Sequence, residues 1–308
     1  MKFLVILICL ALNYFWLRNY DRFDDRWFFR FRENMESVTQ RVVRNDAIWW
    51  PALALIYVVP LLFLGLLLQL AQDQALGLFT MLIHILVVLI AFDRTQPGKL
   101  ARDFLEIWSG NDVEAAMVFL RNEFRGARNQ DFANEEEVAY FFRKHLVYRS
   151  FERMFVQFFW YLAAGPYGVL ASYITYQLRD SGDEKTHPKS TDAVEIVIHL
   201  IEWIPLRLVA LTFSLAGNFV HCFNHLKKSF WEFGRKVDNA GLLYSFAGFA
   251  LFGGIARDDE ADAEERGTDA GGRNYQAWEI ESLQALLERC QLLWLGVLAV
   301  FTIFGPVF

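Results

Sequence analysis

Four ionisable side chains recur at helical spacing within one apolar stretch of the sequence. These are Asp192, Glu195, His199 and Glu202, which follow one another at steps of three, four and three residues. An α-helix turns about 100° per residue, so this spacing places all four on one face. With Arg207 farther along the same stretch, acid, imidazole and guanidinium groups converge. This combination makes the five residues a candidate polar pocket.

Three interpretations of this polar stripe remain open. The helix over 191–203 could lie at a membrane interface, it could form a polar seam inside a bundle, or it could line a functional pocket. Ionisable groups at membrane depth cost on the order of 2.5–3.5 kcal/mol each, so inside a bilayer they need partners. Pro205 should bend the helix and free a carbonyl near Ile201. Arg207 is predicted to point into the bundle and to serve that carbonyl, with Glu202, Glu195 or a bound anion as a further partner.

The composition predicts a membrane protein. Of 308 residues, 55% are hydrophobic and 17% aromatic, and the mean hydropathy is positive. The apolar residues form long runs, which indicates an all-α polytopic bundle with about five to six spans. A further segment, 240–254, is too short to span and could re-enter the membrane or pack closely against other helices. The runs cover 3–17, 48–70, 75–92, 154–178, 194–220 and 292–308.

The distribution of Lys and Arg predicts the orientation. Segments 18–46, 93–153 and 221–289 are rich in basic residues and are assigned to the cytoplasm, while loops 71–74 and 179–191 are assigned to the outside. The whole chain, 1–308, is treated as a single integral membrane domain with cytoplasmic helical segments at 93–153 and 221–289.

Local signals refine the two cytoplasmic segments. Asn111 and Asn134 precede acidic first turns and are predicted to cap helices. Residues 257–274 are acidic and lack large apolar groups, which predicts a flexible loop.

Several classes of function are disfavoured. A net charge of −6 without a concentrated basic face argues against a nucleic-acid partner. No phosphate-binding loop or metal motif is present, so no cofactor and no tightly bound zinc or haem is predicted. The pair His221 and His225 is interpreted as a polar helix end, and His84 as a hydrogen-bonded core histidine. The three cysteines are expected to be small buried hydrophobes, at Cys9, Cys222 and Cys290.

Three stretches resemble the AmpE family of inner-membrane proteins. They read "DAVEIVIHLIEWIPLRLVALTFSLAG", "FFWYLAAGPYGVLASYITYQLRD" and "LGVLAVFTIFGPVF". The resemblance implies a multi-pass protein of the bacterial inner membrane that links peptidoglycan recycling to β-lactamase induction, and hence to antibiotic resistance. It also implies a partner, the cytoplasmic anhydromuropeptide amidase AmpD.

A more distant resemblance is to the CobD/CbiB family, which makes adenosylcobinamide phosphate. The motifs "FWYLAAGPYGV", "PLRLVA" and "NAGLLYSFAGFALFGG" are similar to that family's patterns. They imply a shared scaffold around Trp160, Gly165, Gly168, Pro205, Arg207, Asn239 and Gly241. The stretches "YRSFERMFVQFFW" and "YITYQLRD" depart from the family's polar motifs, so synthase activity is not predicted.

Three functional hypotheses follow. The first is a regulatory protein of the AmpE type. The second is a membrane enzyme or a small-molecule or lipid binder, repurposed from an ATP-dependent amide-forming synthase. The third is a transporter that uses the charged stripe, against which stands the lack of paired half-repeats. The lipid bilayer is a partner in each case, and the sequence does not give an oligomeric state.

Overall fold

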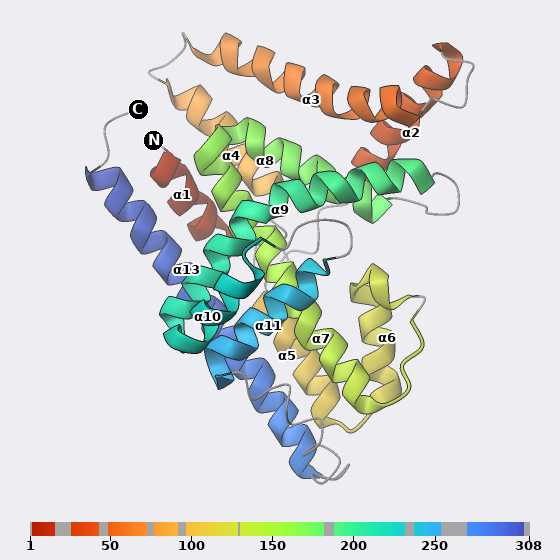
Figure 1. Ribbon diagram of the computed structural model, residues 1–308. Coiled ribbons are helices and arrows are strands. Elements are labelled where there is room, and N and C mark those ends of the chain that lie inside the picture. Colours follow the sequence, from red (N-terminus) through yellow and green to blue (C-terminus); the bar gives the residue numbers. More distant parts are fainter. Residues whose placement is uncertain are drawn as a thin grey trace. The chain divides into compact units, whose positions relative to one another are not determined.

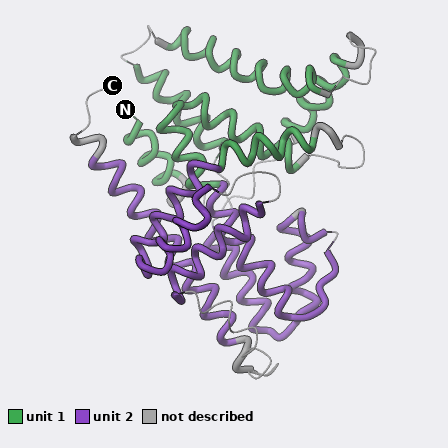
Figure 2. Tube along the Cα trace, viewed as in Figure 1, with its two compact units in different colours: residues 1–94, 153–202 green, residues 95–152, 203–308 purple. Residues whose placement is uncertain are grey.

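The computed structural model describes residues 2–15, 26–42, 49–72, 77–91, 97–128, 130–181, 188–231, 237–253 and 270–304. Every regular element in these ranges is a helix, which confirms the all-α class (Figure 1). The chain divides into two compact units, each made from two separate stretches (Figure 2). Unit 1 comprises residues 1–94 and 153–202, and unit 2 comprises residues 95–152 and 203–308. The expectation of a single integral membrane domain stays a prediction.

Unit 1 is a bundle of apolar helices centred on α4. This helix packs against α1, α3 and α8, and α2 packs against α3. Many side chains of α3 and α4 that face away from the unit are large and apolar, among them Leu62, Phe63 and Leu82. Such a surface suits contact with lipid rather than water. The elements are α1 (Lys2–Phe15), α2 (Arg26–Val42), α3 (Trp49–Gln72), α4 (Leu78–Ala91), α8 (Gln157–Ser181) and the first half of α9 (Pro188–Ala216).

The helix α8 reverses its direction at Gly165. This residue has φ 64° and ψ −149°, a conformation that favours glycine, and Pro166 follows it. Ser172 Oγ lies 2.9 Å from Gln157 Oε1, although the two residues are 15 positions apart. A straight helix would separate them by about 22 Å. The predicted single span over 154–178 is therefore wrong, because this segment folds into a helical hairpin.

The hairpin also changes the expected topology. Arg153 Nη2 and Asp180 Oδ2 lie 3.8 Å apart at its open end, so the chain leaves the hairpin on the side where it entered. This arrangement places the start of loop 179–191 at the same end as the close of segment 93–153. The sequence analysis had assigned them to opposite sides, because it counted an apolar run of sufficient length as one crossing.

Unit 2 contains a compact helical region with an aromatic core. Phe104 stacks on Phe142 with ring centroids 3.8 Å apart, and Trp108, Phe124 and Leu120 are buried around them. The helices predicted within 93–153 are thus confirmed. The elements are α5 (Pro97–Ser109), α6 (Val113–Glu123), α7 (Glu135–Ser150), α10 (Phe219–Ser229), α11 (Asn239–Phe252) and α13 (Ala270–Phe304), with the second half of α9.

One of the two predicted caps is correct. The Asn134 side chain accepts from the N–H of Glu137 at 2.8 Å and caps α7. The cap of α6 is Asp112, whose Oδ1 accepts from the N–H of Ala115. Asn111 instead adopts a left-handed conformation, with φ 65°, in the turn before it. The prediction of Asn111 was thus wrong by one residue, because Asn tolerates this conformation and Asp112 is the better-placed acceptor.

Among the described residues, four helical stretches are long and apolar enough to cross a membrane: Trp50–Ala71, Glu135–Asp180, Thr191–Ala216 and Asn274–Val300. The second of these contains the hairpin. Shorter apolar helices cover Lys2–Leu12, Leu78–Ala91 and Asn239–Phe252. The last agrees with the expectation that 240–254 is too short to span. Of the loop predicted at 257–274, residues 257–269 lie outside the described residues, and α13 begins at Ala270.

Candidate functional site

The predicted polar stripe lies along the first half of α9 and becomes more buried toward its end. Asp192 is exposed, Glu195 and His199 are partly buried, and Glu202 has no exposed surface. The hydroxyl of Tyr176 donates to Glu202 Oε1 at 2.9 Å. Glu202 is therefore buried and bonded to a residue of its own unit, and an interfacial position in water does not describe it.

The helix α9 contacts both arms of the hairpin at consecutive residues. Trp160 Nε1, on the first arm, donates to the carbonyl oxygen of Ile201 at 3.2 Å, and Tyr176, on the second arm, donates to Glu202. The Ile201 carbonyl is the group that Pro205 frees, because proline has no N–H to bond it. The sequence analysis assigned its donor to Arg207 and placed Trp160 only in the scaffold.

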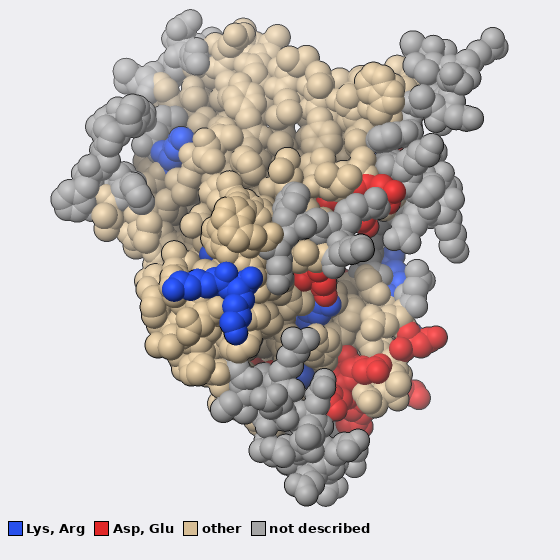
Figure 3. Space-filling view, in the orientation of Figure 1, with Lys and Arg blue, Asp and Glu red and all other residues tan. Residues whose placement is uncertain are grey.

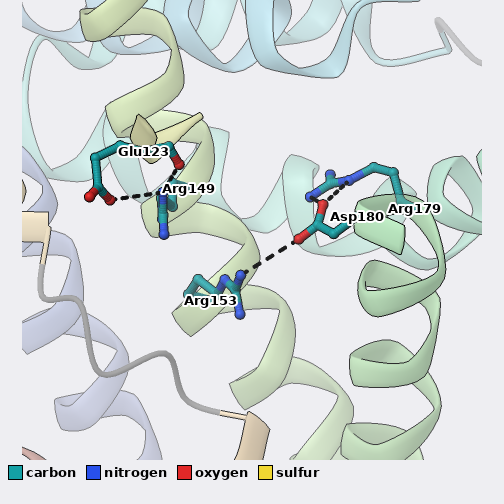
Figure 4. A network of polar contacts seen from close by, with 5 residues as sticks. All are labelled: Glu123, Arg149, Arg153, Arg179 and Asp180. Atoms are coloured by element: carbon teal, nitrogen blue, oxygen red, sulfur yellow. Dashed lines mark hydrogen bonds and ion pairs between the residues drawn. The ribbon is translucent and has the colours of Figure 1, made fainter. Parts of the chain in front are cut away.

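Further polar pairs hold the hairpin together. Ser172 Oγ contacts Gln157 Oε1 and the carbonyl oxygens of Gly168 and Val169. Near the open end, Arg179 donates to Asp180 Oδ1 with both Nε and Nη2, at 3.1 Å each, and Arg153 approaches the other oxygen (Figure 4). We name the set the hairpin cluster, consisting of Arg153, Gln157, Ser172, Tyr176, Asp180 and Glu202.

Four of the six residues of the hairpin cluster lie in the two stretches that depart from the CobD/CbiB patterns. Arg153 and Gln157 belong to "YRSFERMFVQFFW", and Tyr176 and Asp180 belong to "YITYQLRD". From the sequence, both stretches were interpreted as lacking the polar groups of that family, and the polar side chains that they do carry were missed. The signal was present, because Gln157, Tyr176 and Asp180 are polar residues within an otherwise apolar run.

The bonds within the cluster favour positioning over covalent chemistry. The hydroxyl of Ser172 contacts an amide and carbonyl groups, whereas a catalytic serine needs a base within reach. Tyr176 and Glu202 bond each other across two helices. These contacts support a polar seam that fixes α9 against the hairpin, and they leave the pocket interpretation as a hypothesis.

Arg207 lies in unit 2 and is 7% exposed, so it points inward as predicted. Its Nε donates to the carbonyl oxygen of Phe230 at 3.2 Å, and its Nη1 donates to that of Trp203 at 3.3 Å. The guanidinium also lies 5.2 Å from the centre of the Trp203 ring. Arg207 thus joins α9 to the end of α10, and its pairing with Glu202 or Glu195 stays a prediction.

A second buried polar group joins three helices of unit 2. Arg143 Nη1 on α7 donates to Glu279 Oε2 on α13 at 2.5 Å, and the hydroxyl of Tyr244 on α11 donates to Glu279 Oε1 at 2.9 Å. On the same α7, Arg149 Nη1 donates to the carbonyl oxygen of Glu123 at 2.9 Å (Figure 4). Sequence reasoning missed these residues, because α7 and α13 are more than a hundred positions apart.

The glycines of the predicted scaffold have identifiable structural roles. A Cβ on Gly168 would lie 2.5 Å from the carbonyl oxygen of Trp160, so only glycine lets the two arms approach this closely. A Cβ on Gly241 would lie 2.7 Å from Asp238 Oδ2. Gly241 follows Asn239, the buried first residue of α11.

Asp238 at the start of α11 forms an ion pair with Lys144. Burial by itself would raise the pKa of Asp238. The Lys144 ammonium and the backbone N–H groups of Gly241 and Ala240 outweigh it and hold this pKa below its usual value. This contact fixes α11 against α7.

The three cysteines are buried and free, as predicted, and burial raises the pKa of the Cys222 thiol.

His84 Nδ1 lies 2.9 Å from the hydroxyl of Tyr161, which confirms a hydrogen-bonded core histidine. His225 Nε2 contacts Ser245 Oγ at 3.0 Å. Within the described ranges, no three His, Cys, Asp or Glu side chains gather as a metal would require.

Comparison with known proteins gives one match. Residues 3–259 match the family model described as AmpE, regulatory signalling modulator protein AmpE. A search of curated proteins gave no match, and neither did a search of solved structures. The matched range covers most of the chain and includes the stripe, the hairpin and the scaffold glycines. This chain, with its helices able to cross a membrane, therefore belongs to the AmpE family of regulatory signalling modulators.

Proposed function

We propose that this protein is a multi-pass regulator of the bacterial inner membrane that couples peptidoglycan recycling to the induction of β-lactamase. Two facts together support the proposal. The chain belongs to the AmpE family, and it contains both apolar helices suited to a membrane and a helical region with its own core. Unit 1 has an apolar exterior, whereas α5, α6 and α7 form a capped helical region around an aromatic core. A regulator of this kind needs both a membrane part and a part that can contact soluble partners.

The exposed surface of α6 and α7 is the proposed contact for a soluble partner. Acidic side chains gather there, including Glu114, Asp131 and Glu136 (Figure 3). We propose the amidase AmpD as this partner, with contacts from basic residues of the amidase. Complementary charges mainly raise the rate at which two proteins associate. Salt screens these exposed charges, so binding of the amidase should weaken as the salt concentration increases.

Deletion and charge reversal test the proposal. β-Lactamase induction would be measured in a strain lacking the gene and complemented with the wild-type protein or with Glu114→Lys/Glu136→Lys. The control is Glu281→Lys, which reverses an exposed acid on α13. We expect the double variant to lower induction and AmpD capture at an unchanged membrane level. Normal induction in the deletion strain would overturn the regulatory role, whereas full activity of the double variant would overturn only the contact surface.

A second function is supported by the hairpin cluster. Glu202 is fully buried beside Tyr176, and buried acids inside membrane helices often contribute to ligand sites. This observation favours a membrane enzyme or a small-molecule or lipid binder on a scaffold like that of the cobinamide synthases. Native mass spectrometry of the purified protein separates the two proposals. A stoichiometric small molecule that is lost in Glu202→Gln supports the binder, and a co-purified protein supports the regulator.

A further inference from the structure

The helices α9 and α13 run antiparallel along their apolar segments within unit 2. Arg289 Nη1 on α13 donates to the carbonyl oxygen of Ala216 at 3.3 Å, and Trp294 Nε1 donates to Thr212 Oγ1 at 3.0 Å. As the residue number increases along α13, the number of the contacting residue on α9 decreases. Because α9 ends at Ala216, Arg289 lies level with the end of α9.

An open groove of about 680 Å³ begins at Arg289 and follows α13. Every other side chain that lines it is apolar or absent, so the groove has a cationic end and a hydrocarbon-like body. At Gly296 a Cβ would meet no atom within 4 Å, which leaves the middle of the groove wide. The lining residues are Ala216, Arg289, Leu292, Leu293, Gly296, Val297 and Val300.

The charge pattern of α13 places Arg289 at a membrane interface. The sequence carries no charged residue from Cys290 to Phe304, whereas Glu288 and Arg289 come directly before. From Arg289 to Val300 the helix rises about 16 Å, which is close to half of a bilayer core of about 30 Å. The groove therefore has the length of one leaflet.

The helix that follows α9 carries further positive charge and folds back along α9, so that its end lies beside Arg207. α10 carries Lys227 and Lys228 in its last turn, both exposed, and Trp231 just beyond it is 80% exposed. Figure 3 shows basic side chains gathered over α10.

We propose that this groove binds one anionic glycerophospholipid, with an acyl chain along α13 and the phosphate on Arg289. The Nε of Arg289 donates to the carbonyl oxygen of Ala285, and its Nη1 donates to that of Ala216, so the guanidinium is held in place at the mouth of the groove. Its remaining N–H groups match the geometry of a phosphate. In a zwitterionic lipid the cation of the headgroup partly neutralises this phosphate, so an anionic lipid should bind Arg289 more strongly. The nearby Glu288 side chain accepts from Gln284.

Native mass spectrometry of the full chain tests the site, with phosphatidylglycerol or phosphatidylcholine as the added lipid. Two variants probe its two ends. Arg289→Gln removes the phosphate contact, and Gly296→Leu fills the groove without touching either hydrogen bond of Arg289. Arg121→Gln, which removes an exposed arginine of α6, is the matched control.

We expect one phosphatidylglycerol to stay bound to the wild type and to Arg121→Gln at collision energies that remove phosphatidylcholine. Arg289→Gln should lower its retention about tenfold, as expected for the loss of one charge-assisted hydrogen bond. Gly296→Leu should also lower its retention, because the added side chain occupies the space proposed for the acyl chain. Equal retention of both lipids, or normal retention in both variants, would show surrounding bilayer lipid only and overturn the proposal. A dimer that replaces the bound lipid would also overturn it and assign the groove to a second copy. Thermal unfolding of each variant shows whether it is folded.

Discussion

At the scale of single residues, Glu202 shows how a membrane protein can accommodate a buried acid. Its side chain has no exposed surface and accepts from Tyr176, while the neighbouring Ile201 carbonyl accepts from Trp160. Two adjacent polar groups of α9 thus find donors on two different arms of the hairpin. Each donor lowers the cost of keeping a polar group out of water.

Removing the hydroxyl of Tyr176 should therefore destabilise unit 1. We expect Tyr176→Phe to lower the free energy of unfolding by about 1–3 kcal/mol, because the Glu202 carboxyl group loses a donor that no water replaces. Thermal unfolding in detergent measures the effect. Tyr167→Phe, which changes a more exposed tyrosine of the same unit, should have little effect. If both variants melt alike, the Tyr176–Glu202 bond does not stabilise the fold.

The ion pair of Asp238 and Lys144 predicts a dependence on pH. The pKa of Asp238 is lowered in the folded state, so the pair stabilises the protein above the unfolded value near 3.9. This contribution is lost as the pH falls through the folded-state pKa. Because Asp238 is more than half exposed, the effect should be small, about 0.5 kcal/mol. We expect wild type and Lys144→Gln to differ in unfolding free energy at pH 7 and to converge below about pH 4. A constant difference over this range would contradict the assignment.

At the scale of elements, the hairpin of α8 depends on two glycines with different roles. Gly165 adopts the positive φ that reverses the chain, and Gly168 lets the second arm touch the backbone of Trp160. The first role concerns backbone conformation, and the second concerns the space between two arms. Each glycine of the "GPYG" sequence is therefore required for a physical reason: Gly165 for its backbone conformation and Gly168 for the space that it leaves.

Adding one methyl group at Gly168 should open the hairpin. We expect Gly168→Ala to cost about 3 kcal/mol or more, because the new Cβ would lie 2.5 Å from a backbone oxygen that cannot move aside. The control is Gly296→Ala, where a Cβ meets no neighbour and alanine favours the helix by roughly 0.5–1 kcal/mol. Apparent melting temperatures in detergent should fall for the first variant and stay level or rise for the second. A tolerated Gly168→Ala would mean that the arms do not approach this closely.

The elements also show what local sequence could and could not predict. Helices, the Asn134 cap, the bonded His84 and the buried cysteines follow from composition, spacing and polarity, and the structure confirms them. The hairpin was missed because run length alone does not show a reversal, although Gly165 and Pro166 marked its position. The donor to Ile201 was missed because Trp160 lies 41 residues away, and helical periodicity carries no information over such distances.

At the scale of the whole molecule, the chain passes between the two units at points where the helices are irregular. One passage, between Glu152 and Arg153, falls inside a π-helical turn, Phe151–Val156. Another, between Glu202 and Trp203, lies two residues before Pro205. π-Turns and prolines are the usual positions at which helices bend.

The hairpin makes a specific prediction about membrane topology. Arg153 and Asp180 meet at its open end, so an even number of crossings separates α7 from the end of α8. Only six residues join Ser181 to Pro188, and six residues reach at most about 20 Å, which is less than the bilayer core. The start of α9 must then lie on the same side of the membrane as α7. The distribution of Lys and Arg, taken alone, favours the opposite arrangement.

Cysteine labelling distinguishes these two topologies. The native cysteines are buried and would be replaced by alanine, and single cysteines would be placed at Glu136 on α7 and Asp192 on α9, both exposed. We expect a membrane-impermeant maleimide to label both positions in inverted vesicles and neither in intact spheroplasts. If Asp192→Cys reacts from the outside while Glu136→Cys reacts from the inside, the segment crosses the membrane once. The arms of α8 would then have to be separated, and the Ser172–Gln157 bond that joins them would have to break. One of the bonds by which Trp160 and Tyr176 hold α9 against the two arms would break as well.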